Sequence, residues 1–153
     1  MQHGLSMSDT RKALPVCVCA LLVLNAIGAV ISVAAEWPTE FDTEGDPEKV
    51  LEDLPTRGTL LAAPLSVLIV LVVATALTWL RNRWLASIGL AVLIALCLLF
   101  TIGTLGEPLH PEASDPPVAF LIVWKIVVLG VIGSLVALSL IGLYRRWRPA
   151  TAS

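Results

Sequence analysis

Long uncharged stretches alternate with short charged segments along this chain of 153 residues. Residues 13–35, 58–80 and 84–106 each run for 23 residues without a charge. Residues 118–144 form a fourth apolar stretch of 27 residues with one charge, Lys125. Because a helix of about 20 apolar residues crosses the hydrocarbon core of a bilayer, the pattern predicts four membrane-spanning segments.

Each predicted span must be helical, since hydrocarbon offers no partner for a free backbone N–H or C=O group. A β-barrel would show short strands of alternating polarity, and these stretches do not alternate. Only residues 81–83 join the second and third spans, so these two are expected to be antiparallel neighbours. We therefore expect an all-α integral membrane protein, a compact bundle of four transmembrane helices that forms a single membrane domain over residues 1–153.

The distribution of charge predicts the orientation of this bundle. Seven of the ten basic residues lie in 1–12, 81–83 and 145–153, and eleven of the twelve acidic residues lie in 36–57 and 107–117. Basic residues accumulate in cytoplasmic loops, so both termini are expected in the cytoplasm. Hydrophobic residues make up 57% of the chain and charged residues 14%, against about 25% in soluble domains, which excludes a soluble protein.

Two features bear on where the protein resides and how it is processed. Abundant Ala, Val and Leu and a preference for Arg over Lys, seven to three, indicate a prokaryotic plasma-membrane protein. The first apolar stretch ends in Val33, Ala34 and Ala35, which also fits a cleaved secretory signal, although about 20 apolar residues exceed the usual core of ~7–15. Met7 is an alternative start of the chain.

The first outer loop, residues 36–57, carries eight acidic and two basic residues, a net charge of −6. Asp46 and Pro47 are typical of a helix start, and the apolar positions that follow predict a short amphipathic helix over 47–54. Acid spacing from Asp42 resembles a calcium loop, but Pro47 occupies the position that needs a glycine, which excludes an EF-hand. The loop is a solvated connection, a weaker divalent-cation site or a docking surface for a protein partner, with candidate contacts at Asp42, Glu44, Asp46, Glu48, Glu52 and Asp53.

Two polar residues stand out within the spans. Lys125 lies eight residues into the fourth span, and a charge there marks a candidate functional site. It is either an interfacial anchor whose ammonium reaches the headgroups or one half of an ion pair with Glu36 or Glu107, which follow the first and third spans. Asn25 is the other polar group at depth.

Small residues form stripes at helical spacing on two spans. Such stripes let helix backbones approach closely, within one chain or between two copies. The first stripe joins Asn25 to Gly28 and Ser32, and the second comprises Gly130, Gly133, Ser134 and Ala137.

Candidate chemistry is sparse. His110 and the nearby acids of the second outer loop are the one outer cluster of mixed ligand types, and the three cysteines lie within spans. We therefore expect no catalytic residues, cofactor, metal or nucleic-acid partner. The leading hypothesis is a non-enzymatic accessory or interaction subunit, whose partners are the lipid bilayer and either another protein or further copies of itself. An oligomeric transporter or channel that uses Asn25 and Lys125 is the alternative, followed by a membrane enzyme that uses His110.

Overall fold

The computed structural model describes residues 7–37, 49–106 and 117–147. Every regular element in these ranges is a helix, apart from one isolated β-bridge between Thr59 and Ala62. The helices are α1 (Met7–Ala34), α2 (Val50–Asp53), α3 (Leu65–Thr78), α4 (Arg83–Gly106) and α5 (Val118–Trp147).

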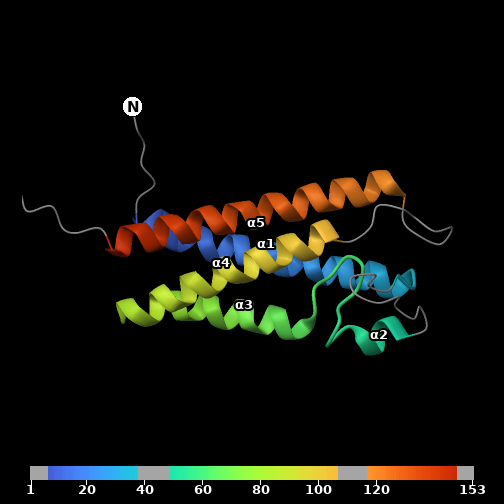
Figure 1. The fold of residues 1–153 in the computed structure, drawn as a ribbon, viewed down its shortest axis with the longest axis horizontal. Helices are drawn as coiled ribbons and strands as arrows, with labels where there is room; N and C mark the ends of the chain where they lie inside the picture. The colour runs from blue at the N-terminus through green and yellow to red at the C-terminus, as the bar shows by residue number, and fades with distance from the viewer. Residues whose placement is uncertain (1–6, 38–48, 107–116, 148–153) are drawn as a thin grey trace, which may run out of the picture.

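The four longer helices run roughly along one axis, with α2 beside one end of the bundle (Figure 1). We refer to this end as the α2 end. The start of α1, the turn between α3 and α4 and the end of α5 lie at the opposite end. Helix α4 packs against both α3 and α5, and α1 packs against α5 and α3, so the four helices enclose a common core.

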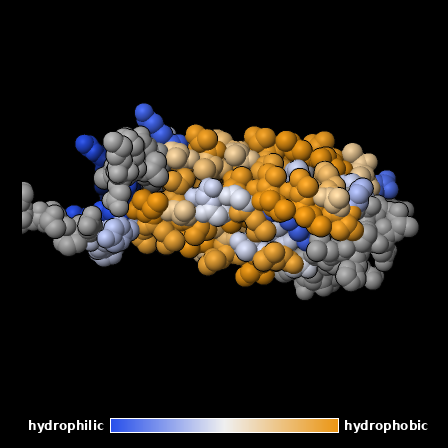
Figure 2. Space-filling model, turned by 90° about the horizontal axis from the view of Figure 1, so that it is seen from above, coloured by the Kyte–Doolittle hydropathy of each residue, from blue (hydrophilic) through white to orange (hydrophobic). Residues whose placement is uncertain are grey.

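The exposed surface of the bundle is apolar. Helices α4, α5 and residues 12–34 of α1 are each long and apolar enough to cross a membrane, whereas α3 is a shorter apolar helix. Large aliphatic side chains such as Val30, Ile69 and Val123 are more than half exposed. Figure 2 shows hydrophobic residues over most of the visible face, with strongly hydrophilic ones mainly toward the two ends. A surface of this kind contacts the lipid bilayer, so the protein is a helical membrane protein.

Buried side chains in the core recur at helical spacing, as on any helix with one packed face. Leu21 of α1, Leu71 of α3, Leu93 of α4 and Leu135 of α5 have no exposed surface. They belong to one continuous apolar cluster that draws on all four long helices. The core of the bundle is thus mainly apolar, and the buried side chains of Thr78, Ser87 and Ser139 add hydroxyl groups toward the opposite end.

Helix α3 is shorter than the predicted span. It begins at Leu65, whereas the uncharged stretch begins at residue 58, and its 14 residues rise only about 21 Å at ~1.5 Å per residue. Pro64 precedes it in an extended conformation (φ −55°, ψ 142°), and Gly58 has a positive φ of 81°. Residues 58–64 are therefore not helical, although their composition is as apolar as that of a span.

The amphipathic helix predicted over 47–54 is a single turn, α2, in the described part of the chain, which excludes residues 47 and 48. Val50 is buried as predicted, and Leu54 is partly buried. Leu51 differs from the expected buried face, since its side chain is 66% exposed. One turn presents only part of the predicted face to the bundle, so Leu51 lies on the outer surface of α2.

At the opposite end, α5 is fastened to the turn between α3 and α4. Arg146 donates a hydrogen bond through Nη2 to the carbonyl oxygen of Thr78 at the end of α3 (2.9 Å). The indole N–H of Trp147 donates to Oγ of Ser87 (3.2 Å), and its ring meets Trp84 edge to face with centroids 5.0 Å apart. A cation at a helix C-terminus also complements the helix dipole.

The packing of α3 on α4 depends on Gly89. A Cβ atom there would lie 2.7 Å from the carbonyl oxygen of Ala74 and 2.9 Å from Cβ of Leu77. Replacing Gly89 with Ala should therefore destabilise the protein by about 1–3 kcal/mol, because two backbones must separate. Thermal unfolding of the purified protein in detergent would show this as a lower midpoint.

Gly133→Ala is the matched control for this variant. Nothing lies within 4 Å of a Cβ atom at Gly133, so alanine should be neutral or should stabilise the helix by up to ~1 kcal/mol. Equal unfolding midpoints for the two variants would contradict the close approach of α3 and α4.

Candidate functional site

Residues 58–64 form a non-helical stretch that packs against α1, and we refer to them as the 58–64 segment. The chain leaves α2 and turns back toward α1 and α4 before α3 begins (Figure 1). A tight turn is closed by hydrogen bonds from the Thr59 N–H to the Ala62 carbonyl (2.8 Å) and from the Ala62 N–H to the Thr59 carbonyl (3.3 Å). The Ala62 N–H also lies 3.2 Å from Oγ1 of Thr59.

Side chains of α1 bind two further N–H groups of this segment. Oδ1 of Asn25 accepts a hydrogen bond from the N–H of Ala63 (2.8 Å), and Oγ of Ser32 accepts one from the N–H of Leu61 (3.3 Å). Nδ2 of Asn25 donates to the Leu21 carbonyl of its own helix (2.9 Å), which orients the amide. Both side chains are buried, so they satisfy backbone groups that would otherwise be costly to keep from water.

Gly28 lies between these two residues on the same face of α1, about one turn before Ser32. A Cβ atom at Gly28 would lie 2.5 Å from the Leu61 carbonyl oxygen and 2.9 Å from Cζ2 of Trp124. Glycine is needed here because the 58–64 segment and Trp124 pack directly on the α1 backbone. The stripe of small residues predicted on the first span is thus a seam, and it receives a loop backbone and an indole ring.

The end of α1 is held by the same residue that binds the loop. The N–H of Trp37 donates to the carbonyl oxygen of Ser32 (2.8 Å), and Glu36 takes a positive φ of 57°. This is the Schellman pattern of helix termination, with glutamate at the position where glycine is usual. Ser32 therefore accepts one hydrogen bond from the chain that follows α1 and another from the 58–64 segment.

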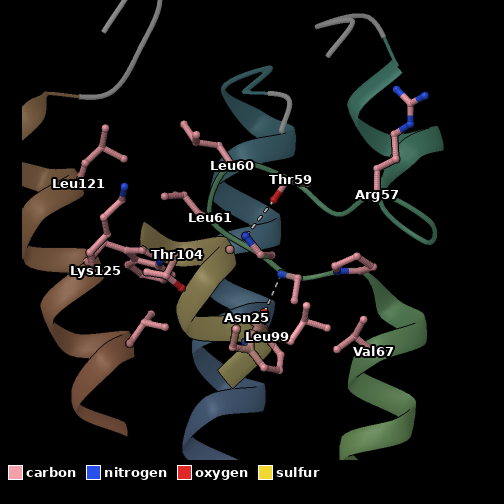
Figure 3. Close-up of a pocket in the computed structure, with 17 residues that line it drawn as sticks. Asn25, Arg57, Thr59, Leu60, Leu61, Val67, Leu99, Thr104, Leu121 and Lys125 are labelled. Atoms are coloured by element: carbon pink, nitrogen blue, oxygen red, sulfur yellow. Dashed lines mark hydrogen bonds between the residues drawn. The ribbon is translucent and has the colours of Figure 1, made fainter. Parts of the chain in front are cut away.

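A cavity of about 260 Å³ lies beside the 58–64 segment. Its walls come from that segment and from all four long helices, through Asn25, Val67, Leu99 and Trp124 among others. Figure 3 shows Lys125 on the α5 wall with its ammonium directed along the helix toward Leu121, and Arg57 where α2 leads into the segment. The walls are mainly apolar, and both charged residues among the described lining residues are cations.

The structure brings together two residues that the sequence singled out separately. Asn25 and Lys125 line the same cavity, and Lys125 is partly buried there. Glu36 is exposed beyond the end of α1, and Glu107 lies outside the described residues. The ion pair between Lys125 and one of these glutamates therefore stays a prediction.

The second stripe of small residues does not pack within the bundle. Gly130, Gly133, Ser134 and Ala137 are exposed on α5, and a Cβ atom at either glycine would meet nothing within 4 Å. The hydroxyl of Ser134 bonds to the Gly130 carbonyl of its own helix (2.9 Å). The structure therefore does not show this stripe as a packing contact within one chain. A packing contact between two chains stays a hypothesis.

Most of the predicted acidic contacts fall outside the described residues, namely Asp42, Glu44, Asp46 and Glu48, as does His110. Glu52 is exposed on α2 and Asp53 is partly buried. The carbonyl oxygen of Asp53 accepts hydrogen bonds from the N–H groups of Arg57 (2.8 Å), Thr56 (3.0 Å) and Gly58 (3.2 Å). Within the described ranges, no group of three or more His, Cys, Asp or Glu side chains is placed to hold a metal ion.

The sequence pattern does not predict the 58–64 segment, because an apolar stretch of this length predicts a helix throughout. Two residues in the sequence are compatible with a break in the helix. Gly58 favours a turn at the start of this segment, and Pro64 favours a helix start at its end. The sequence marks Asn25 as a polar group within a span. Its hydrogen bond with the N–H of Ala63, however, forms only because the 58–64 segment packs against α1. No spacing rule along the chain predicts that contact.

The fold and this site define a helical membrane protein with a loop clamped into one end of its bundle and a cavity beside that loop. Comparisons with protein families, with curated proteins and with solved structures find no match.

Asn25 should be the residue that holds the 58–64 segment in place. Asn25→Ala leaves the buried N–H of Ala63 without its acceptor, which should cost about 1–3 kcal/mol and raise amide exchange across residues 59–63. Hydrogen–deuterium exchange with mass spectrometry in detergent micelles measures both the local exchange and its temperature dependence.

Ser134→Ala is the matched control, because it also removes a helix-borne polar group that bonds to a carbonyl four residues earlier, but on the exposed face. Exchange across 59–63 that is the same in Asn25→Ala, Ser134→Ala and the unchanged protein would refute the clamp.

Proposed function

We propose that this protein is a non-enzymatic plasma-membrane subunit of a prokaryotic cell, which binds a protein partner through the α2 end of its bundle. The observation that carries the proposal is the clamp of Asn25 and Ser32 on the 58–64 segment. It fixes the loop that follows α2, so the surface of α2 is presented from a preorganised position. A preorganised surface loses less conformational entropy when a partner binds, which favours tight binding.

The proposed topology has four membrane crossings, with both termini in the cytoplasm and the α2 end outside. Three long apolar helices support three of the crossings. For the fourth, α3 and the 58–64 segment cross together. Non-helical backbone is tolerated at membrane depth where protein buries it and satisfies its polar groups, as Asn25 and Ser32 do here.

The contribution of α1 to this arrangement favours a permanent first span over a cleaved signal. Leu14, Val18 and Leu21 of α1 are buried in the core, and Asn25 and Ser32 hold the loop. Removing α1 would open the core and release the 58–64 segment.

The chemistry of the proposed docking surface combines an apolar contact with negative charge. Leu51 is 66% exposed beside the exposed carboxylate of Glu52, and the preceding loop adds further acids in sequence. An exposed leucine within an acidic surface suits a partner with an apolar pocket rimmed by basic residues. The negative charge would speed the diffusional encounter with a basic partner, and the apolar contact would slow dissociation of the complex.

An oligomeric transporter or channel is the second candidate, and one observation favours it. Asn25 and Lys125, which are polar groups at depth, line one cavity. Toward the opposite end, however, the interior is filled by Leu21, Leu71, Leu93 and Leu135, all without exposed surface. A path through a single bundle would have to displace this packed core, so transport would need an assembly of several chains.

Neutralising acids of the first outer loop and of α2 should abolish association with the partner. The variant combines Glu44→Gln, Asp46→Asn, Glu48→Gln and Glu52→Gln, and the protein is isolated from its native membrane in a mild detergent. Mass spectrometry of what accompanies it should show a stoichiometric protein that is lost in the variant, because the attractive charge is gone.

Leu51→Ser tests the apolar half of the same surface and should also remove the partner, while leaving the bundle intact because Leu51 is exposed. The matched control is Glu112→Gln with Asp115→Asn, which removes charge from the other outer loop and should retain the partner. Retention of the partner by the fourfold and Leu51 variants would refute the proposal.

The transporter candidate makes a different prediction. If Asn25 and Lys125 line a transport path, ion or solute flux in liposomes should fall severalfold on Lys125→Met, while Ser134→Ala should leave it unchanged. A purified homo-oligomer that supports such flux and isolates without a second protein would favour transport over the accessory role.

A further inference from the structure

The cavity beside the 58–64 segment has the characteristics of a ligand site that the proposed docking role does not use. Its volume is about 260 Å³, just below the ~300 Å³ at which pockets for drug-sized ligands begin. A methylene-sized group takes up about 30 Å³, similar to the volume of a water molecule. The cavity therefore has room for roughly eight such groups in a row or cluster. That is the size of part of one acyl chain.

The lining of the cavity separates into two regions. Its apolar walls are formed by side chains such as Val67, Leu99, Phe100 and Val128. Lys125 and Arg57 are its charged residues among the described lining, and Figure 3 shows the Lys125 ammonium directed toward Leu121, near the start of α5. An apolar chamber with a cation toward one end matches an amphiphile with an anionic head group and not a neutral or cationic one.

The cavity also borders the surface that contacts lipid. Leu99 lines it and is 55% exposed on α4. One helical turn further on, Gly103 lines it as well, and a Cβ atom there would meet nothing within 4 Å. Gly103 leaves open space in this part of the wall, so a chain from the surrounding bilayer can enter beside Leu99 without crossing water.

From this arrangement we infer that the cavity binds a single acyl chain whose anionic head group is held by Lys125. The occupant comes from the surrounding bilayer, as a fatty acid or one chain of an anionic lipid. Lys125 already interacts with another group in this structure, as does Arg57. An ammonium carries three N–H donors, so it can bond a carboxylate or phosphate oxygen and keep another partner.

Photolabelling of the full chain in neutral phosphatidylcholine nanodiscs tests this inference. The probe is a palmitic acid that carries a photoreactive diazirine on its chain, and the comparison probe is the corresponding alcohol. After irradiation, mass spectrometry should find saturable labelling by the acid on the peptides of α4 and α5 that line the cavity. The alcohol should label these peptides about tenfold less, since it lacks the charge-assisted bond.

Gly103→Leu should fill the cavity and reduce labelling by the acid about tenfold or more. It should fold, because the position has open space for a side chain. Gly133→Leu is the matched control, since Gly133 has equally open space on α5 but does not line the cavity. Labelling by the acid should be unchanged in Gly133→Leu.

Lys125→Gln should reduce labelling by the acid about tenfold and leave labelling by the alcohol unchanged, whereas Lys125→Arg should stay within about twofold of the unchanged protein. Labelling that persists in Gly103→Leu would show lipid on the outer surface only and would overturn the inference. Equal labelling by acid and alcohol, insensitive to Lys125, would overturn the assignment of an anionic head group. None of these outcomes depends on the protein partner, whose loss or retention is measured separately.

Discussion

The structure depends most on the hydrogen bond between Oδ1 of Asn25 and the N–H of Ala63. At 2.8 Å it joins the middle of α1 to a loop 38 residues later in the chain, and it satisfies a backbone group that neither helix nor lipid could serve. The hydrogen bond from the Leu61 N–H to Oγ of Ser32 adds a second tie, two helical turns further along the same face of α1. Together they allow seven apolar residues to lie in the bundle without helical hydrogen bonds.

Several features at the α2 end follow from this clamp. Gly28 is required because the clamped backbone passes directly over α1, and Trp124 of α5 packs on the same spot. Because the 58–64 segment occupies the space that a longer α3 would have filled, the four long helices do not close on one another there, and the cavity remains between them. The same loop therefore supports two separate roles, the position of α2 on its outer side and the cavity on its inner side.

The two ends of the bundle are held together by different interactions. Toward the opposite end, mainly apolar side chains and the buried Ser139 fill the interior, and Arg146 and Trp147 join α5 to α3 and α4 through polar atoms of Thr78 and Ser87. At the α2 end, polar side chains of α1 bind backbone, and the interior is partly open. A protein that is packed at one end and hollow at the other can offer a ligand or partner site without opening its core.

The amino-acid sequence by itself determined the class of protein, since the length of the uncharged stretches leaves only helices in a bilayer. It also singled out Asn25 and Lys125 as polar groups within spans, and Gly28 and Ser32 as part of a stripe of small residues. Only the tertiary structure decided that α3 begins at Leu65 and that Asn25 and Lys125 meet at one cavity, while the second stripe of small residues faces outward. The physical reason is that hydropathy reports whether a segment avoids water, whereas the partner of each buried N–H group is set by what packs against it.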